Sequence, residues 1–334
     1  MNAILLSDKN EGRVRKVYTA EHLSRLSRLF EIPDRVYSKE DVLREKGSFG
    51  EVRCIFSTWG MPEFDKEEIR AIFPKLEALF YAAGSVQRFA RPFLEEGVHV
   101  FSAWAANGIP VAEYTFAQIT LGMKGFYQTS RIFKEKGRKA AKECFSHFPG
   151  NYGATVGIIG AGMIGKLVIE KLRALNVNTM VFDPFLPDEK ARELGVEKTD
   201  LTTLFSSCQV LSNHLANNEQ TRGMLRKEHF SAMLPYATFL NTGRGAQVVE
   251  EDLIAVLKER EDLTAVLDVT FPEPPEDGSD FYTLPNVILT PHIAGSEGNE
   301  VQRMTDYMIE EAVSFLTGKP VRYEVSLEML KTMA

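Results

Sequence analysis

The stretch from Thr155 to Gly165 constrains the fold of this chain more than any other. An apolar, β-branched run leads into three glycines spaced G-x-G-x-x-G, and an amphipathic pattern continues to Leu172. In such a strand–turn–helix unit, the first glycine makes a tight turn, the second lets a pyrophosphate approach the helix N-terminus, and the third lets the helix pack on its strand. The residues predicted to bind a dinucleotide here are Gly160, Gly162, Met163, Ile164 and Gly165.

An acidic residue supports this interpretation. A second apolar run, residues 179–182, ends in Asp183, eighteen residues after Gly165, where a carboxylate binds the ribose hydroxyls of the adenosine. Its charge repels a 2'-phosphate, and the following Pro184 and Phe185 bring no cation to offset that repulsion. The sequence therefore predicts NAD rather than NADP as cofactor. The alternative is a tight turn in an unrelated α/β protein, which the order of strand, glycines, helix and acid disfavours.

Length and composition limit the other possibilities. A chain of 334 residues fits two domains, and its 44% apolar and 25% charged residues are typical of a soluble globular protein. The net charge of -7 leaves no basic surface for nucleic acid or an anionic membrane, so an anionic substrate needs a local cationic site. No segment reaches the length of a membrane span, and residues 1–8 resemble a first strand more than a signal peptide.

The cysteines bear on the compartment and on metal binding. Cys54, Cys144 and Cys208 lie far apart, are odd in number and lack metal-ligand spacing. Such a set is typical of reduced thiols in a cytosolic protein, so we expect a cytoplasmic location and no metal site.

Hydrophobic periodicity places the elements of the first domain. From the start to about Phe101, short apolar strands alternate with helical patterns, which is typical of a parallel α/β sheet. The expected strands are Ala3–Leu6, Val52–Ser57, Leu76–Ala82 and Val98–Phe101, and the expected helices are Ala20–Glu31 and Lys66–Ala71. A further helix is expected to begin within residues 107–114, where Asn, Gly and Pro signal a start. Because it is apolar nearly all round, we expect it to be buried between domains or subunits.

A polar, charged stretch, residues 131–153, leads into the glycine motif, and the βα alternation continues beyond it. The later strands are expected at 209–213, 238–242, 264–268 and 287–290, and the clearest helices at Glu250–Glu259 and Asn299–Leu316. The last helix is expected to return to the first domain. The predicted organisation is thus a substrate domain from residues 1–106, an NAD-binding domain at 107–296, and a return to the substrate domain at 297–334.

Three loops each follow a predicted strand and each present one ionisable side chain: Arg244, Glu273 and His292. Arginine offers a planar fork that fits a carboxylate, and histidine titrates near neutrality beside a carboxylate that can orient it. Taken singly, such residues are more often a solvated charge, a turn residue and a structural histidine. Together, at the edge of a sheet that follows a dinucleotide motif, they suit hydride transfer to a 2-oxo acid.

With these residues, the sequence resembles the D-isomer-specific 2-hydroxyacid dehydrogenase family, which includes phosphoglycerate, glycerate and D-lactate dehydrogenases. The resemblance covers the chain from about Leu76 to Gly318, and the N-terminal 75 residues agree in pattern only. It implies an α/β protein of two Rossmann-like and flavodoxin-like domains with parallel sheets. In such proteins the nucleotide-binding domain is inserted into the substrate domain, the active site lies in the cleft between them, and the nucleotide domains pair in a homodimer.

The resemblance also implies residue roles. Arg244 would bind the substrate carboxylate and polarise the carbonyl, His292 would be the acid/base, and Glu273 would be its partner. For the cofactor it implies contacts from Thr242, Gly243, His214, Leu215 and Asp268. For the substrate it implies contacts from Ala83, Gly84, Ser85 and Asn107, and Trp104 either shapes the pocket or packs at a domain junction.

The sequence departs from the family pattern near the expected pocket. Val86 and Phe89 stand where the family usually has Asp, in a loop that also carries Arg88 and that faces the cleft in relatives. Thr270 replaces a common Phe, and Ala216 replaces a frequent Pro near the adenosine. None of these positions belongs to the proposed triad, so the departures concern the substrate pocket.

The predicted function is NAD-dependent interconversion of a 2-oxo acid and a D-2-hydroxy acid, both small-molecule partners. One alternative is an NAD(H)-sensing binding protein that resembles the C-terminal-binding-protein corepressors, although the chain shows no long polar tail. Formate dehydrogenases would have Gln in place of Glu273, whereas oxidation of phosphite remains open. An S-adenosylmethionine methyltransferase would share the early glycines but would not explain the three ionisable loop residues.

Overall fold

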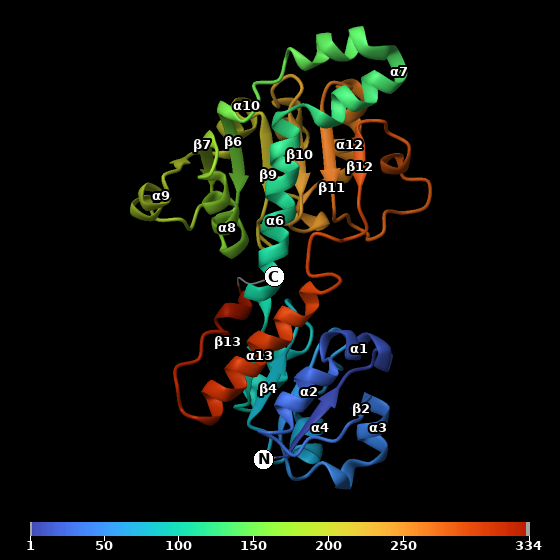
Figure 1. The fold of residues 1–334 in the computed structure, drawn as a ribbon, viewed down its shortest axis with the longest axis vertical. Helices are drawn as coiled ribbons and strands as arrows, with labels where there is room; N and C mark the ends of the chain where they lie inside the picture. The colour runs from blue at the N-terminus through green and yellow to red at the C-terminus, as the bar shows by residue number, and fades with distance from the viewer. Residues whose placement is uncertain (1, 332–334) are drawn as a thin grey trace. The chain divides into compact units, whose positions relative to one another are not determined.

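The computed structural model describes residues 2–331, which form two compact units (Figure 1). The first unit holds the chain up to Gly108 and again from Ser296, and the second unit holds Ile109–Gly295. Each unit has its own sheet with hydrophobic clusters on its two faces. Among the described residues, no helix has the length and apolar character needed to cross a bilayer, and no His, Cys, Asp and Glu side chains gather as a metal site would require.

A six-stranded sheet organises the first unit, in the order β13-β5-β4-β3-β1-β2. Its strands are β1 (Asn2–Leu6), β2 (Val36–Tyr37), β3 (Val52–Ser57), β4 (Ala78–Tyr81), β5 (His99–Ser102) and β13 (Glu324–Val325). The strands from β5 to β2 run parallel, as the βα alternation predicts. The short β13, which periodicity does not predict, adds an antiparallel edge to β5.

The helices of the first unit are α1 (Glu11–Val17), α2 (Ala20–Leu26), α3 (Lys39–Arg44), α4 (Lys66–Ile72), α5 (Ala90–Glu95) and α13 (Glu300–Leu316). The prediction for α2 was too long, because it ends at Leu26 rather than Glu31. Tertiary pairing takes over there: the Glu31 carbonyl accepts a hydrogen bond from the Ala3 amide at 3.0 Å. The last helix does return to this unit, as the sequence predicts.

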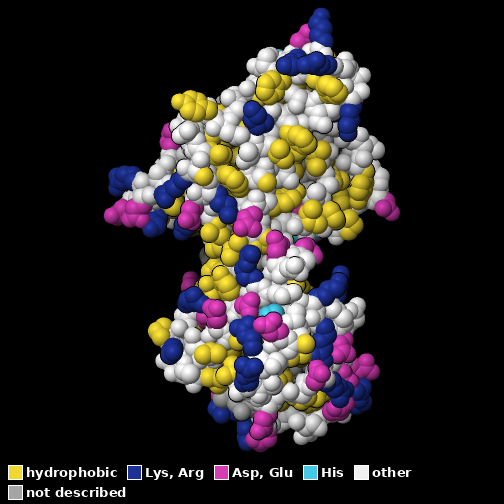
Figure 2. Space-filling view, viewed as in Figure 1, with side chains coloured by type: hydrophobic (Ala, Val, Ile, Leu, Met, Phe, Trp, Pro, Cys, Tyr) yellow, Lys and Arg dark blue, Asp and Glu magenta, His cyan; other side chains and the backbone are white. Residues whose placement is uncertain are grey.

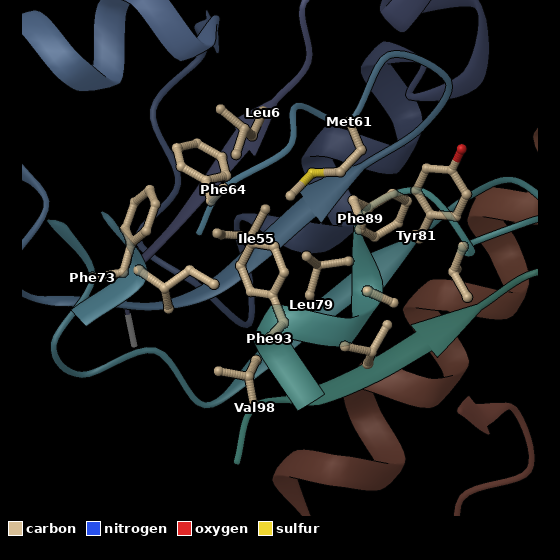
Figure 3. Packing of buried hydrophobic residues seen from close by; sticks show 14 of the residues in the cluster. Leu6, Ile55, Met61, Phe64, Phe73, Leu79, Tyr81, Phe89, Phe93 and Val98 are labelled. Carbon is tan, nitrogen blue, oxygen red and sulfur yellow. The ribbon is translucent and has the colours of Figure 1, made fainter. Parts of the chain in front are cut away.

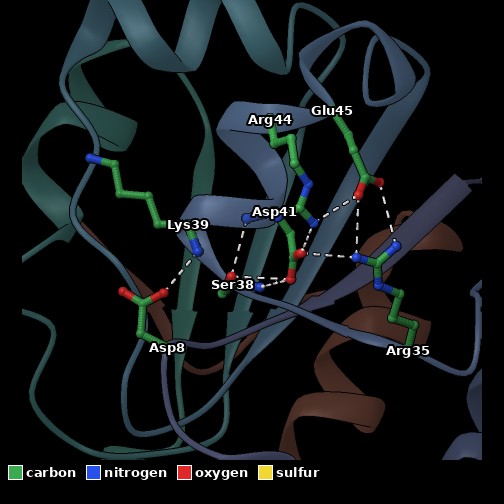
Figure 4. Close-up of polar contacts among 7 residues, drawn as sticks. All are labelled: Asp8, Arg35, Ser38, Lys39, Asp41, Arg44 and Glu45. Atoms are coloured by element: carbon green, nitrogen blue, oxygen red, sulfur yellow. Dashed lines mark hydrogen bonds and ion pairs between the residues drawn. The ribbon is translucent and has the colours of Figure 1, made fainter.

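Side-chain caps fix where several of these helices begin. The Ser38 hydroxyl accepts from the Asp41 amide, and the Asp41 carboxylate accepts from the Ser38 amide, each at 3.1 Å (Figure 4). Arg35 and Arg44 both donate to Asp41, and both also pair with Glu45. The start of α3 is therefore determined by residues close in sequence.

Aromatic side chains fill one face of this sheet. Phe64 packs edge-on against Phe73 and Phe93, with ring centroids 5.9 and 6.2 Å apart (Figure 3). Val86 and Phe89 belong to the same cluster and are 0% and 3% exposed. The departures from the family pattern at these two positions therefore put two apolar side chains into the core of the first unit.

The second unit is built on a seven-stranded parallel sheet, in the order β12-β11-β10-β9-β6-β7-β8. Its strands are β6 (Tyr152–Ile159), β7 (Asn176–Phe182), β8 (Glu197–Lys198), β9 (Val210–Asn213), β10 (Thr238–Asn241), β11 (Thr264–Leu267) and β12 (Val287–Leu289). The chain order reverses between β6 and β9, whose carboxyl ends therefore form a topological switch point. Ligands bind open α/β sheets at such points.

The helices of the second unit are α6 (Trp104–Met123, which starts in the first unit), α7 (Phe126–Phe145), α8 (Met163–Leu172), α9 (Asp188–Leu194), α10 (Leu201–Ser207), α11 (Lys227–Ser231) and α12 (Glu250–Glu259). The sequence placed the start of α6 too late, since it begins at Trp104 and carries Pro110 inside. Most of residues 131–153, expected only as a polar stretch, belong to α7, which is kinked at Gly137. Within one chain Leu121 of α6 is 37% exposed, so burial of this helix between subunits stays a prediction.

Candidate functional site

The glycine motif forms the predicted turn between β6 and α8. Gly160 has φ +93, a conformation that side chains with a Cβ rarely adopt. A Cβ added at Gly165 would lie 2.1 Å from the Gly160 carbonyl oxygen, so only glycine allows α8 to pack this closely on the turn. The turn therefore has the geometry that the sequence predicts.

The N-terminus of α8 suits an anionic ligand. No side chain in the described part of the chain caps this helix, so its first amides remain available. A Cβ added at Gly162 would meet nothing within 4 Å, so the backbone of the turn is approachable. These features fit a pyrophosphate, whose charge would lie at the positive end of the helix beside Met163 and Ile164.

Asp183 follows β7 and lies against the same turn. One carboxylate oxygen accepts from the Ala161 amide and the other from the Phe185 amide, each at 2.8 Å. Each oxygen keeps a second lone pair for a ribose hydroxyl. The acid thus both holds the glycine turn and offers a negative charge beside it.

His214 follows β9 on the other side of the switch point. Its amide donates to the Ile159 carbonyl at 2.7 Å, and its Nε2 lies 2.8 Å from the Ser212 hydroxyl. Burial lowers the pKa of His214 to about 3, so the ring is neutral at physiological pH. Its buried Nδ1 has no hydrogen-bond partner among the described residues.

Arg244 follows β10 in the loop that also holds Thr242 and Gly243. Its Nη1 donates to the Gly243 carbonyl at 2.8 Å, and the Thr242 hydroxyl lies 3.2 Å from that of Thr115. Burial lowers the pKa of Arg244, while the charge of Glu273 acts in the opposite direction. Arg244 is therefore a partly desolvated cation within electrostatic reach of Glu273, and such a cation attracts a carboxylate strongly.

Glu273 and His292, expected as a pair, come together. The Glu273 carboxylate lies 2.7 Å from Nδ1 of His292, and their side chains remain 41% and 47% exposed. His292 has φ +57, the left-handed conformation that is unusual for a residue other than glycine. Because Nδ1 faces the carboxylate, Nε2 is the ring atom left to face a substrate.

Asp268, at the end of β11, holds the histidine loop in place. Its buried carboxylate accepts from the Thr290 hydroxyl at 2.6 Å and from the amides of Ile293 and Ala294 at 2.9 Å. The His292 amide also donates to the Asp268 carbonyl, at 3.1 Å. The family resemblance implies a cofactor contact for Asp268. Its hydrogen bonds to the loop after β12 were not predicted, because hydrophobic periodicity does not show contacts between distant segments.

Glu250 is a further residue that the sequence reasoning missed. Its carboxylate accepts from the Phe271 amide at 2.7 Å and so holds the loop that carries Glu273. Burial raises the pKa of Glu250 to about 7. The sequence does not indicate this contact, because an acid in the first turn of a helix is usually explained by its favourable interaction with the helix dipole.

The expected substrate residues lie in the first unit. Ala83 is buried and Ser85 is exposed, and the Ser102 hydroxyl lies 3.0 Å from the Ala83 carbonyl and 2.6 Å from the Gly84 carbonyl. Asn107 accepts from the Ser296 amide at 3.0 Å. Trp104 packs edge-on against Tyr323 at 5.8 Å. This contact lies within the first unit, so a role of Trp104 at the substrate pocket or at a domain junction stays a prediction.

The chain is similar in sequence to known dehydrogenases. A family model described as the NAD-binding domain of D-isomer-specific 2-hydroxyacid dehydrogenases matches residues 116–294, more than half of the chain. D-3-phosphoglycerate dehydrogenase of Archaeoglobus fulgidus is 32% identical over 237 residues, which cover 71% of this chain and 44% of that protein. Glycerate dehydrogenase of Methylorubrum extorquens is 32% identical over 186 residues, which cover 54% of this chain and 57% of that protein. The matched part of the chain thus spans about half the length of these curated relatives.

Solved structures share the fold. A phosphoglycerate oxidoreductase from Rhizobium etli has a TM-score of 0.80 at 21% identity, with 98% of this chain and 99% of that chain covered. The apo form of D-mandelate dehydrogenase from Rhodotorula graminis has a TM-score of 0.79 at 19% identity, with 97% of each chain covered. At such identities the likeness is one of fold. The family model settles the affiliation: this chain belongs to the D-isomer-specific 2-hydroxyacid dehydrogenase family, and residues 116–294 form its NAD-binding domain.

Proposed function

We propose that the chain is an NAD-dependent oxidoreductase that interconverts a 2-oxo acid and the corresponding D-2-hydroxy acid. The observation that carries the proposal is the Glu273–His292 pair, 2.7 Å apart, in a dinucleotide-binding unit. Burial lowers the pKa of Arg244, and the negative charge of Glu273 counteracts this and so favours the charged form of Arg244. A carboxylate-oriented imidazole beside a desolvated guanidinium can bind an anion and move a proton. When bound, NADH supplies the hydride for the substrate carbonyl.

Each triad residue has one proposed role. Arg244 binds the substrate carboxylate with the N–H groups that do not donate to Gly243, and it stabilises the negative charge that develops on the carbonyl oxygen. His292 gives the proton from Nε2 to that oxygen during reduction and takes it back during oxidation. Glu273 accepts from Nδ1 and so fixes the ring orientation.

The binding roles follow the same division. Asp183 is proposed to bind the adenosine ribose, and His214 with Leu215 to line the adenosine side. Thr242, Gly243 and Asp268 are proposed to line the nicotinamide side. Ala83, Gly84 and Ser85 are proposed to offer main-chain amides to the substrate carboxylate, with Asn107 and Trp104 beside the substrate.

A panel of 2-oxo acids tests the proposal directly. Loss of NADH absorbance would be followed with pyruvate, glyoxylate, hydroxypyruvate, phenylglyoxylate and branched-chain 2-oxo acids, and the chirality of each product determined. Stereospecific formation of a D-2-hydroxy acid supports the proposal. If NADH binds but no member of the panel is reduced, the dehydrogenase proposal fails and an NAD(H)-sensing protein or a phosphite dehydrogenase takes its place.

NADH is expected to give a kcat/KM at least about tenfold higher than NADPH, because the Asp183 carboxylate repels a 2'-phosphate at close range. Steady-state kinetics with both cofactors at one fixed 2-oxo acid concentration measure this ratio. Because the Asp183 carboxylate is partly exposed, salt screens this repulsion, and higher ionic strength should lower the ratio of kcat/KM for NADH to that for NADPH. A preference for NADPH at low salt would contradict the role given to Asp183.

We also propose that the chain forms a homodimer through the second unit. Apolar side chains gather on the face over which α6 runs (Figure 2). The exposed apolar side chains of α6, α7 and β12 include Leu121, Phe126, Phe133 and Ile288, which are 37%, 50%, 55% and 37% exposed, and Phe126 and Ile288 line one hollow. Burying such a surface against a second copy of the chain with two-fold symmetry is favourable.

Light scattering should give twice the chain mass of 37.5 kDa, and Leu121→Lys should lower the measured mass. A mass of 37.5 kDa for the unmodified chain at micromolar concentration would exclude a stable dimer.

A further inference from the structure

Three buried carboxamide side chains join the two loops that follow the neighbouring strands β9 and β10. Asn213 ends β9, Asn241 ends β10, and Gln247 lies in the short helix η2 (Gly245–Gln247), and they are 0%, 1% and 0% exposed. Asn213 Nδ2 donates to Asn241 Oδ1 at 3.0 Å and to Gln247 Oε1 at 2.5 Å. We call these three residues the carboxamide bridge.

On one side the bridge holds the main chain around Arg244. Gln247 Oε1 accepts from the Arg244 amide at 3.3 Å, and Asn241 Nδ2 donates to the Arg244 carbonyl at 3.1 Å. Asn241 Oδ1 accepts from the Gly243 amide at 3.1 Å. Because the guanidinium itself donates to the Gly243 carbonyl, both the backbone and the side-chain conformation of Arg244 depend on these contacts.

On the other side the bridge holds the loop that follows His214. Gln247 Nε2 donates to the carbonyls of Leu215 and Ala216 at 2.7 and 3.0 Å, and Asn213 Oδ1 accepts from the Leu215 amide at 3.2 Å. All six side-chain nitrogen and oxygen atoms of the bridge therefore have hydrogen-bond partners. A buried polar network of this kind is stabilising only when every member is satisfied, which favours one arrangement of both loops.

We propose that Gln247 is a positioning residue for Arg244, acting through the carboxamide bridge rather than through contact with substrate. This inference rests on the proposed dehydrogenase function. The alternative is that Gln247 contributes only to stability, as any buried, hydrogen-bonded amide does. The two differ in whether the effect of losing Gln247 depends on the Arg244 side chain.

A double-mutant cycle separates them. Gln247→Met keeps the length of the side chain and removes both polar atoms, and it should lower kcat/KM for the best 2-oxo acid roughly tenfold, the effect of about one buried hydrogen bond. In an Arg244→Ala background, assayed at high enzyme concentration, the same change should cost less than about twofold, because there is no guanidinium left to misplace. Equal losses in the two backgrounds, or no loss in either, would overturn the proposal.

Asn286 offers a matched control in the same unit. It is 3% exposed and donates to the carbonyls of Leu257 and Arg260 at 3.0 and 3.3 Å. It precedes the amino end of β12, whereas Asn213 and Asn241 lie at the carboxyl ends of their strands. Asn286→Leu should lower the unfolding temperature as Gln247→Met does, yet leave kcat/KM within about twofold of the unmodified enzyme.

Hydrogen exchange of the protein without cofactor gives a second readout. Gln247→Met should speed exchange in a peptide covering residues 241–248, whereas Asn286→Leu should not. Unchanged exchange in that peptide would overturn the inference even if no 2-oxo acid were reduced. By contrast, failure of the unmodified enzyme to reduce any 2-oxo acid, with faster exchange in the Gln247 variant, would reject the proposed function and leave the loop-anchoring part of the inference standing.

Discussion

His292→Ala is expected to lower kcat for 2-oxo acid reduction by about 10²–10⁴-fold with NADH affinity unchanged. The imidazole is the one group of the proposed triad that can give a proton to the carbonyl oxygen near neutral pH. Alanine removes that donor, while the glycine turn and Asp183, which are proposed to bind the cofactor, lie at the ends of β6 and β7 and keep their contacts. Single-turnover absorbance traces with saturating NADH would measure the chemical step, and fluorescence titration would measure NADH affinity.

His147→Ala supplies a control for the general cost of losing a histidine. His147 is exposed beyond the end of α7, where its ring contacts the Cys144 carbonyl at 3.1 Å, and this variant should keep normal kcat. Glu273→Gln should lower kcat less than His292→Ala does, because the amide can still accept from Nδ1 at the same position. If His292→Ala kept near-normal turnover on the best substrate, the proton would have to come from another group.

Arg244→Ala should lower kcat/KM by about 10²–10⁴-fold, through both a higher KM and a lower kcat. The guanidinium is proposed to bind the carboxylate in the ground state and the developing charge in the transition state, so its loss affects both constants. Arg244→Lys should recover only part of the loss, because an ammonium keeps the charge but lacks the planar fork. Initial rates over a wide range of 2-oxo acid concentrations would separate the two constants.

Arg173→Ala is the matched control for this change. Arg173 follows α8 in the same unit and donates to the Glu193 carbonyl at 2.9 Å, away from the carboxyl ends of the strands. It should leave kcat/KM unchanged. A pure change in KM for Arg244→Ala would show that Arg244 binds the carboxylate equally in the ground state and in the transition state.

The parts of this site that depend on local sequence were predictable. The glycine turn, the acid after β7 and the loops after β10, β11 and β12 follow from periodicity and from turn chemistry, which act over a few residues. The pairing of Glu273 with His292 was also expected, and the structure brings the two side chains together.

Other parts depend on contacts between residues distant in sequence. Gln247 reaches Leu215 and Asn213 from another loop, and Glu250 reaches the Phe271 amide, yet each residue alone has an unremarkable sequence context. The same limit applies to secondary structure: α2 ends early because β1 pairs with Glu31, and burial of Val86 and Phe89 depends on the whole first unit. Periodicity cannot report which distant backbone atom a side chain will reach.

Asp183 accepts from two main-chain amides and is also proposed to bind the adenosine ribose, and this double role has a consequence for redesign of cofactor preference. The obvious route toward NADP replaces the acid with a small or basic residue, but here that change would also remove the acceptors for the Ala161 and Phe185 amides. Such a variant would no longer repel a 2'-phosphate, but its glycine turn would be less firmly held. Its affinity for both cofactors would therefore fall. A route that keeps Asp183 and introduces a cation at Phe185, whose side chain is 76% exposed, changes the charge without dismantling the turn. The first step of an NADP-directed lineage, in the laboratory or in evolution, would therefore be more accessible at position 185 than at position 183.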